Sequence, residues 1–437
     1  MTKISARATT ALLTDRYELT MLQATLRNGT AERESVFELF ARQLPDGRRY
    51  GVVAGIGRAL DALADFTFDG AALGYLRRAD VVDEATLGWL ADFRFTGNIW
   101  GYPKGEIYFP GSPVVIVEGS FAECVILETL FLSVLNHDAA IASAAARMIS
   151  AAGNRPCIEM GSRRTHEGAA VASARAAYIA GFAATSNLQA GDTYGIPTAG
   201  TSAHSFTLLH DSERDAFAAQ IEALGKDTTL LVDTYDIPEA VRTAVELAGP
   251  ELGGVRLDSG DLVSLAKAVR KQLDDLGAAR TRITVTSDLD EYAIAALASA
   301  PVDSYGVGTA LVTGSGAPTC GFVYKLVARA GDNGDMVPVA KKSEGKASLG
   351  GRKYVLRQKS RGGTAQAEVI GIGEPPVDDG DDRSILIPLV TRGRRVYNES
   401  LDDARQRLRS SLAELPASAV QLSRGEPVID TIYKDLA

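Results

Sequence analysis

The polar residues best suited to chemistry follow short apolar segments, each of which has the composition of a β-strand. In a parallel α/β fold, ligands meet the carboxyl ends of the strands, so the residues directly after each strand are the ones to inspect. Arginines, aspartates, a histidine and a glycine-rich turn gather at these positions. The segments are 161–164, Ser186-Asn187, 200–205, 233–236, 256–261, Ser287-Asp288 and 306–309.

This combination of side chains suits a phosphorylated sugar. Guanidinium groups such as those of Arg163 and Arg256 bind phosphate oxygens, and a carboxylate such as Asp258 binds ribose hydroxyls or Mg²⁺. The small residues around Gly306 and Gly308 leave backbone N–H groups free to hold a phosphate. The sequence therefore predicts an enzyme that handles phosphate esters.

Each of these features also has an ordinary structural explanation. A Gly-x-Gly sequence alone is equally consistent with a plain strand-to-helix turn, and Arg163-Arg164 with a solvated pair at a helix start. Ser259 or Asp261 is consistent with an N-cap ahead of a helix, although a cap leaves Arg256 unexplained.

Of the four histidines, His204 is the strongest candidate for catalysis. It stands at a predicted strand end after a run of Gly, Thr, Ser and Ala, which leaves little bulk around its ring, and both a catalytic and a structural role remain open. His137, beside Asp138 near the end of an apolar helix, is predicted to be a cap. No H-E-x-x-H spacing and no Walker A sequence is present, so neither a zinc hydrolase nor a P-loop ATP site is expected.

Short strands alternating with helices must position these residues. One expected helix, 261–276, has Leu262, Leu265, Val269 and Leu273 on a single stripe, with a stop at Gly277. Alternation of this kind predicts parallel strands with covering helices, and a barrel is favoured over an open doubly wound sheet because no dinucleotide fingerprint marks the first turn. The expected strands are 157–159, 182–185, 230–232, 254–257, 283–286 and 304–307.

The regions on either side of these strands have different secondary-structure patterns. Residues 1–120 mix helix and strand signals and are predicted to form an N-terminal α+β domain, followed by long Ala-rich helices at 121–136 and 138–152. Residues 121–356 are assigned to the α/β barrel that carries the active site. The segment 357–437, with a helix at 401–413, is expected to pack back on the N-terminal domain.

Composition narrows the class of protein. The chain has 437 residues, a formal net charge of −9 and 46% hydrophobic residues, which favours a globular protein with a sizeable core and disfavours a general nucleic-acid binder. Its three cysteines form no C-x-x-C pair, which suggests a reducing cytosol rather than a disulfide framework. No signal peptide is recognised, and the most apolar stretch, 114–135, is interrupted by three glutamates.

Six motifs closely resemble those of the nicotinate phosphoribosyltransferases. They occur in the family's order, and their joint occurrence is highly specific. They are 13–21 (LTDRYELTM), 159–164 (EMGSRR), 200–205 (GTSAHS), 232–236 (VDTYD), 256–261 (RLDSGD) and 305–309 (YGVGT), and the segment 341–344 (KKSE) extends the match.

The resemblance implies the fold and the reaction. The fold would be the irregular α/β barrel of a type II phosphoribosyltransferase with an N-terminal α/β domain, working as a homodimer whose subunits share active sites. The reaction would join nicotinate to phosphoribosyl pyrophosphate, giving nicotinate mononucleotide and pyrophosphate for NAD synthesis. Mg²⁺ would assist, and ATP would be hydrolysed as co-substrate through a phosphohistidine, for which the matching residue is His204.

The resemblance also implies roles for individual residues. Asp233 would orient the ring of His204 in catalysis, and Asp15 and Tyr17 would reach the pyridine site from the neighbouring subunit. The remaining implied contacts are Arg163 and Arg256 with anionic or ring groups, Asp258 and Asp288 with ribose hydroxyls or Mg²⁺ (Asp258 being the candidate metal ligand), and Gly306, Gly308 and Thr309 with the 5′-phosphate.

Two positions bear on the choice of substrate. Related enzymes that use nicotinamide carry an acidic residue where Ser186 stands, so Ser186 favours nicotinate, whose carboxylate an acid would repel. Many family members have an aromatic residue where Met160 stands, and a thioether can take over the contact with the pyridine ring. The alternatives are a nicotinamide or quinolinate phosphoribosyltransferase, and a barrel that binds nucleotide without catalysis.

Overall fold

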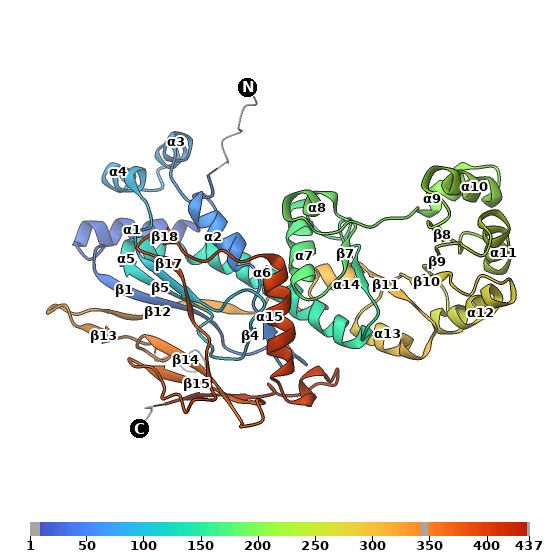
Figure 1. Ribbon diagram of the computed structural model, residues 1–437. Helices are drawn as coiled ribbons and strands as arrows, with labels where there is room; N and C mark the ends of the chain where they lie inside the picture. Colours follow the sequence, from blue (N-terminus) through green and yellow to red (C-terminus); the bar gives the residue numbers. More distant parts are fainter. Residues whose placement is uncertain (1–8, 342–347, 435–437) are drawn as a thin grey trace. The chain divides into compact units, whose positions relative to one another are not determined.

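The computed structural model describes residues 9–341 and 348–434, and it divides into two compact units. Unit 1 comprises Met1–Ala140 and Thr319–Ala437, and unit 2 comprises Ile141–Pro318 (Figure 1). These boundaries differ from the predicted ones, which lie at 120/121 and 356/357. The units divide differently because the strands that follow residue 319 pair with those of unit 1. Most of the 341–344 motif lies outside the described residues.

Unit 2 is built on six parallel strands that confirm the predicted set. Their spatial order is β7-β6-β11-β10-β9-β8. If the two edge strands β7 and β8 are treated as neighbours, each strand lies between the strands that precede and follow it in the cyclic order β6 to β11. Among the described strands, β7 and β8 are the one neighbouring pair in this cycle without a ladder, so the sheet is an irregular barrel opened between them. The strands are β6 (Cys157–Glu159), β7 (Ala184–Thr185), β8 (Thr229–Leu231), β9 (Gly254–Leu257), β10 (Arg282–Val285) and β11 (Ser304–Val307).

Helices follow the strands, and polar side chains fix where they begin. Asp261 accepts a hydrogen bond from the Ser264 N–H and caps α12, which confirms the N-cap explanation for Asp261. Asp236 caps α11 in the same way. The helices of unit 2 are α7 (Glu167–Ile179), α8 (Leu188–Tyr194), α9 (His204–Leu209), α10 (Glu213–Leu224), α11 (Ile237–Ala248), α12 (Leu262–Asp275), α13 (Glu291–Ala296), η1 (Leu297–Ser299) and α14 (Thr309–Val312).

Unit 1 contains a seven-stranded sheet to which both ends of the chain contribute. Its strand order is β13-β12-β1-β5-β3-β17-β18, in which β12 pairs with β1 and β17 pairs with β3. The expectation that the C-terminal segment packs back on the N-terminal domain is therefore confirmed. The strands are β1 (Glu34–Ala41), β3 (Asn98–Gly101), β5 (Val115–Ser120), β12 (Phe322–Ala330), β13 (Met336–Pro338), β17 (Ile387–Thr391) and β18 (Arg394–Arg395).

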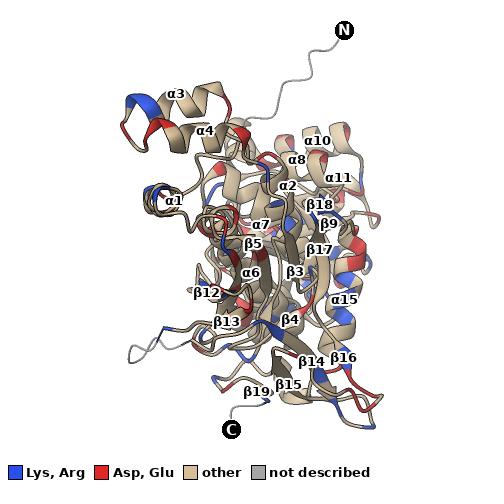
Figure 2. Cartoon of the chain, turned by 90° about the vertical axis from the view of Figure 1, so that its left-hand side faces the viewer, with Lys and Arg blue, Asp and Glu red and all other residues tan. Residues whose placement is uncertain are grey.

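Two smaller sheets and a set of helices complete unit 1. The smaller sheets are β16-β14-β15-β19 and β2-β4. α3 ends on two basic residues, Arg77 and Arg78, whereas α15 begins with the acidic Asp402 and Asp403 and carries basic residues after them (Figure 2). The remaining elements are α1 (Arg16–Asn28), α2 (Ile56–Ala64), α3 (Gly70–Arg78), α4 (Glu84–Asp92), α5 (Phe121–Val125), α15 (Leu401–Ala413), η2 (Ala417–Val420), β2 (Gly51–Val52), β4 (Ile107–Tyr108), β14 (Lys353–Lys359), β15 (Ala365–Ile372), β16 (Arg383–Ser384) and β19 (Asp430–Tyr433).

The prediction of two helices at 121–136 and 138–152 is wrong in detail. A short α5 precedes one continuous helix, α6 (Glu128–Ala152), because no Gly or Pro interrupts this segment. His137 is therefore inside a helix rather than at its end, and its Nδ1 lies 2.9 Å from Oδ1 of buried Asp138, which also accepts from Arg58 at 2.6 Å. The stretch Phe121–Ala152 is long and apolar enough to cross a membrane, but 67% of its apolar window is buried inside the structure, as in a core helix.

A buried charge network joins the C-terminal strands to the N-terminal part of unit 1. Arg357 is fully buried, with Nη1 3.4 Å from Glu106 Oε1, and its Nη2 donates to Glu368. Glu106 also accepts from Arg383 Nη1 at 2.7 Å. Because both carboxylates are shielded from water, each depends on these guanidinium groups for compensation.

Substitution of Arg357 is expected to destabilise unit 1. In an Arg357→Met variant Glu368 loses its guanidinium partner, whereas Glu106 keeps Arg383, so we expect a loss of about 3 kcal/mol in the free energy of unfolding, measured by urea denaturation. The control is Arg77→Met, which removes the exposed ion pair with Glu84 and is expected to leave the urea midpoint unchanged. Equal effects of the two substitutions would contradict this explanation.

Candidate active site

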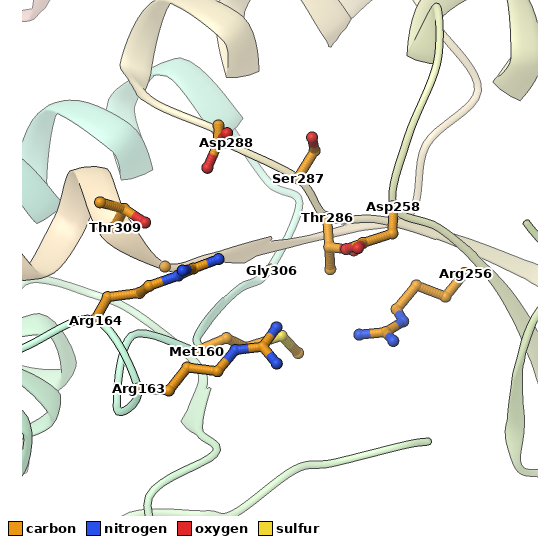
Figure 3. A pocket seen from close by; sticks show the side chains of 11 residues that line it. Met160, Arg163, Arg164, Arg256, Asp258, Thr286, Ser287, Asp288, Gly306 and Thr309 are labelled. Carbon is orange, nitrogen blue, oxygen red and sulfur yellow. The ribbon is translucent and has the colours of Figure 1, made fainter. Parts of the chain in front are cut away.

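A cavity of about 270 Å³ opens at the carboxyl ends of β6, β9, β10 and β11 (Figure 3). Eight of the eleven residues predicted to bind substrate line it, although they come from four separate strand ends. The parallel strands produce this convergence, because their carboxyl ends meet on one side of the barrel. The lining residues are Met160, Arg163, Arg164, Arg256, Asp258, Thr286, Ser287, Asp288, Gly306, Gly308 and Thr309.

Three guanidinium groups give the cavity its positive charge. Arg163 and Arg256 point toward one another across the space, and Arg164 extends toward Gly306 (Figure 3). Arg256 Nη2 donates to the Ser202 carbonyl at 2.8 Å, and its buried Nε has no partner within the described part of the chain. Burial lowers the pKa of Arg256, and the neighbouring Asp258 and Asp233 oppose that effect. No ion pair of these three arginines is recorded among the described residues, so their charge is available to an anion.

Side chains that carry hydroxyl or carboxylate oxygens lie on the opposite side of the cavity (Figure 3). The Thr286 hydroxyl donates to Asp258 Oδ1, and Asp288 and Ser287 are exposed at the end of β10. Ser287 has a backbone φ of 114°, a conformation that L-residues rarely adopt. Carboxylate and hydroxyl oxygens are the ligands that Mg²⁺ accepts, together with water and phosphate, so Asp258 and Asp288 fit that ion.

The floor of the cavity requires glycine at residue 306. The Met160 N–H donates to the Val307 carbonyl at 2.8 Å, which brings the Met160 side chain over β11. A Cβ atom at Gly306 would lie 2.5 Å from Thr286 Cγ2 and 2.7 Å from Met160 Sδ. A Cβ at Gly308 would lie 3.4 Å from its nearest neighbour, which is an ordinary contact. Residue 306 is therefore a glycine because any larger side chain would collide with Met160 and Thr286.

His204 and Asp233 form the pair that the sequence predicted. His204 Nε2 lies 3.1 Å from Asp233 Oδ1, and the Asp233 side chain is 1% exposed whereas that of His204 is 40% exposed. The other Asp233 oxygen accepts from the Asp258 N–H at 3.0 Å and from the Ser259 hydroxyl at 2.7 Å. Asp233 is thereby fixed, and it holds the His204 ring with Nδ1 left without a partner within the described residues.

Two hydrogen bonds connect this pair to the cavity. The segment that leads into His204 accepts a bond from Arg256 through the Ser202 carbonyl, and the Asp233 carboxylate accepts one from the backbone of Asp258. His204 does not itself line the cavity, but both of its supports contact residues that do. A change of charge on His204 would therefore alter the electrostatic potential in the cavity.

Three of the residues predicted to bind substrate are not among those that line the cavity. Ser186 is exposed after β7, where its N–H donates to the Glu159 carbonyl at 2.8 Å. Asp15 and Tyr17 are in unit 1, at the start of α1. Asp15 accepts from the Thr129 hydroxyl at 3.0 Å, and the half-exposed Tyr17 has a pKa raised to about 12 by burial and by Glu128.

Sequence reasoning missed several residues of this site. It did not select Thr286, which lines the cavity, and it named Ser287 only within the strand-end segment Ser287-Asp288, without a role. It considered Ser259 only as an N-cap, whereas its hydroxyl supports Asp233. The positive φ of Ser287 has no sequence signal, because a glycine would ordinarily be expected in that conformation.

Two family models match consecutive parts of the chain. The N-terminal domain of nicotinate phosphoribosyltransferase matches residues 12–136. The C-terminal domain of quinolinate phosphoribosyl transferase matches residues 141–315, which include every residue that lines the cavity.

Individual relatives agree with the family models. A nicotinate phosphoribosyltransferase of Mycobacterium tuberculosis is 59% identical over 429 residues, covering 96% of this chain and 94% of that protein. A nicotinate phosphoribosyltransferase of Bacillus subtilis is 40% identical over 359 residues, covering 79% and 73%. The crystal structure of human nicotinic acid phosphoribosyltransferase superposes with a TM-score of 0.83 at 26% identity, covering 97% of this chain and 98% of the human one.

Proposed function

The chain belongs to the nicotinate phosphoribosyltransferase family, and from this premise we propose how its cavity performs the transfer. The protein is a phosphoribosyltransferase that makes nicotinate mononucleotide for NAD salvage. The cavity that Arg163, Arg256, Asp258 and the 306–309 turn line holds phosphoribosyl pyrophosphate. The single observation that carries this proposal is the convergence of unpaired guanidinium groups, carboxylates and a small-residue turn on one cavity.

The chemical step needs charge stabilisation more than a strong base. The ring nitrogen of nicotinate forms a bond to the ribosyl carbon as the bond from that carbon to pyrophosphate breaks, so positive charge develops on the sugar and negative charge on the leaving group. Arg163 and Arg256 offset the negative charge. Arg163 is exposed, whereas Arg256 is partly buried, so its interaction with the leaving group is stronger than it would be in water. Gly306, Gly308 and Thr309 hold the 5′-phosphate and fix the sugar for in-line attack.

Asp258 and Asp288 are the residues that would hold Mg²⁺ in this cavity. When bound, Mg²⁺ would neutralise charge on the pyrophosphate oxygens. Asp258 is already placed for this role by the Thr286 hydroxyl, and its backbone is fixed by Asp233. Asp288 is exposed and free to turn toward the ion or toward the ribose hydroxyls.

ATP coupling operates through His204. The unpartnered Nδ1 attacks the terminal phosphorus of ATP, forming an N–P bond while the P–O bond to ADP breaks, and water later cleaves the N–P bond to release phosphate. The Nε2 atom of His204 keeps its hydrogen throughout and donates it to Asp233, whose negative charge stabilises the cationic phosphoimidazole. Phosphorylation adds roughly two negative charges beside a cavity that binds pyrophosphate, so it alters the affinity for substrate and product.

Two residues support nicotinate as the pyridine substrate. Ser186, which follows β7 and does not line the cavity, is uncharged, so its side chain does not repel the carboxylate of nicotinate. Met160 offers a thioether to the face of the ring. In a homodimer, Asp15 and Tyr17 of the second subunit would complete this pyridine site. The three buried free cysteines agree with a reducing cytoplasm as the enzyme's location.

Pyrophosphate release with three pyridines tests the proposed substrate. Purified protein is incubated with phosphoribosyl pyrophosphate and either nicotinate, nicotinamide or quinolinate, with and without ATP. We expect release with nicotinate, stimulated by ATP, and at least tenfold less with the other two. Preference for another pyridine would reassign the substrate, and binding without release would identify a non-catalytic barrel.

The packing at Gly306 gives a further prediction. In Gly306→Ala, the new methyl group displaces Met160 and Thr286, and Thr286 positions Asp258, so we expect the KM for phosphoribosyl pyrophosphate to rise about tenfold. Initial rates at varied substrate concentration measure this effect. The control is Gly88→Ala on α4, where a Cβ meets open space and KM should be unchanged. A Gly306→Ala enzyme with wild-type KM would show that this contact does not shape the site.

A further inference from the structure

Glu213 is a half-buried carboxylate that the proposed mechanism does not use. It is the first residue of α10, directly after the N-cap Ser212. Its Oε1 atom is buried and has no hydrogen-bond partner in the part of the chain that the structure describes. A carboxylate oxygen shielded from water without a donor is unfavourable when it is ionised.

The groups that face Glu213 from the neighbouring elements are mainly acidic. Asp233 and Asp236 stand between β8 and α11, and Glu239 is in the first turn of α11. The adjoining helix α9 carries two histidines: His204, which lies 3.1 Å from Asp233, and His210, whose Nδ1 lies 2.8 Å from the Phe206 carbonyl oxygen. The charged neighbours on α10 are engaged elsewhere: Arg214 with Glu246 at 2.9 Å, and Asp215 with Ser212 at 2.6 Å.

These surroundings favour the protonated form of Glu213. Burial and the charges of Asp236, Asp233 and Glu239 raise the pKa of Glu213 to about 7. Asp233, by contrast, accepts hydrogen bonds from the Asp258 N–H and the Ser259 hydroxyl and lies 3.1 Å from the His204 ring. At and below about pH 7, Glu213 therefore holds a proton beside this hydrogen-bonded pair.

We propose that Glu213 is a positioning residue that holds one proton beside the Asp233–His204 pair and makes phosphorylation of His204 depend on pH. This proposal rests on the proposed function. When Glu213 is protonated, Asp233 is free to stabilise the phosphorylated ring without a second negative charge nearby. When Glu213 loses its proton to solvent, its charge repels the incoming phosphoryl group.

The direction of the effect follows from the raised pKa. Glu213 is neutral below about pH 7 and anionic above it, so phosphorylation of His204 is favoured on the acidic side and declines as the pH rises through 7. The phosphoryl group itself adds negative charge and promotes proton uptake by Glu213. We expect the amount of phosphohistidine to fall roughly tenfold from pH 6 to pH 8.5.

The experiment compares wild type, Glu213→Gln and Glu246→Gln across pH 5.5–9. Phosphohistidine formed from ATP is expected to decline with a midpoint near pH 7 in wild type and in the control Glu246→Gln, which removes an exposed carboxylate of α11. In Glu213→Gln, which mimics the protonated side chain, the amount of phosphohistidine is expected to stay, across the whole pH range, at the level measured at acidic pH. An unchanged midpoint in Glu213→Gln would overturn the proposal.

A second measurement does not require phosphorylation. The side-chain carboxyl signals are followed by carbon-13 NMR against pH, with the Glu213 signal assigned by its loss in Glu213→Gln. We expect the Glu213 signal to titrate with a midpoint near pH 7. If no phosphohistidine forms but the Glu213 signal titrates as expected, the ATP coupling fails while the proton site stands. A Glu213 signal that titrates near the ordinary glutamate pKa of about 4.3 would show that Glu213 holds no such proton.

Discussion

A His204→Ala variant is expected to lose all stimulation of nucleotide synthesis by ATP and all formation of phosphoprotein. The ring Nδ1 is the proposed acceptor of the phosphoryl group, and no other histidine in the described residues is held by Asp233. The cavity itself is unchanged by the substitution, so pyrophosphate release without ATP should continue at the wild-type rate without ATP. Rates with and without ATP, together with transfer of labelled phosphate from ATP to protein, measure the two losses.

The matched control for this prediction is His166→Ala. His166 is also the partner of a nearby carboxylate, 3.6 Å from Glu167, but its side chain is 75% exposed and lies before α7. It should retain full ATP stimulation. If His204→Ala kept both ATP hydrolysis and stimulation, another residue would be the phosphoryl acceptor.

Removal of Arg256 is expected to reduce kcat/KM roughly 10³-fold. Its guanidinium group lies in the cavity without an ion pair, and its Nη2 fixes the Ser202 carbonyl ahead of His204. Arg256→Ala therefore removes both the charge proposed to stabilise the leaving group and a support of the segment that holds the proposed phosphoryl acceptor. Steady-state kinetics with phosphoribosyl pyrophosphate and nicotinate measure the loss.

Two further variants separate charge from shape at this position. Arg256→Lys keeps the charge but not the planar pair of donors, so we expect partial recovery, about tenfold above Arg256→Ala. Arg242→Ala removes an exposed arginine paired with Glu239 on α11 and should leave kcat/KM unchanged. A loss of less than threefold in Arg256→Ala would place pyrophosphate elsewhere.

The barrel strands were predictable because their signal is local. Three of them, Cys157–Glu159, Gly254–Leu257 and Ser304–Val307, have the expected bounds, since apolar β-branched or aromatic residues end at polar turn residues. The carboxyl edge of the barrel then follows from the parallel arrangement, and with it most of the cavity.

The parts that were not predicted depend on contacts between distant residues. The pairing of β1 with β12 joins Phe37 to Leu326, and the ladder of β3 with β17 joins Ile99 to Val390, so no local pattern specifies either. The continuity of α6 was missed because His137 was interpreted as a cap, whereas it lies inside the helix beside Asp138, which is buried and paired with Arg58. A buried ion pair of that kind has no signature in the sequence.

The site shows the same division between local and distant information. His204 and Asp233 were paired through the family's motifs, and their 3.1 Å contact agrees with that prediction. The strained backbone of Ser287 and the unpartnered carboxyl oxygen of Glu213 were not predicted, because both features exist only when the neighbouring elements are in place. The roles of all these residues remain predictions until the variants are measured.

A crystal structure of the enzyme with nicotinate mononucleotide and pyrophosphate tests the central claim most directly. We expect the 5′-phosphate against the turn at Gly306 and Gly308, and the pyrophosphate within hydrogen-bond distance of Arg163 or Arg256. Nucleotide bound outside this cavity, with both guanidinium groups facing only solvent, would contradict the account.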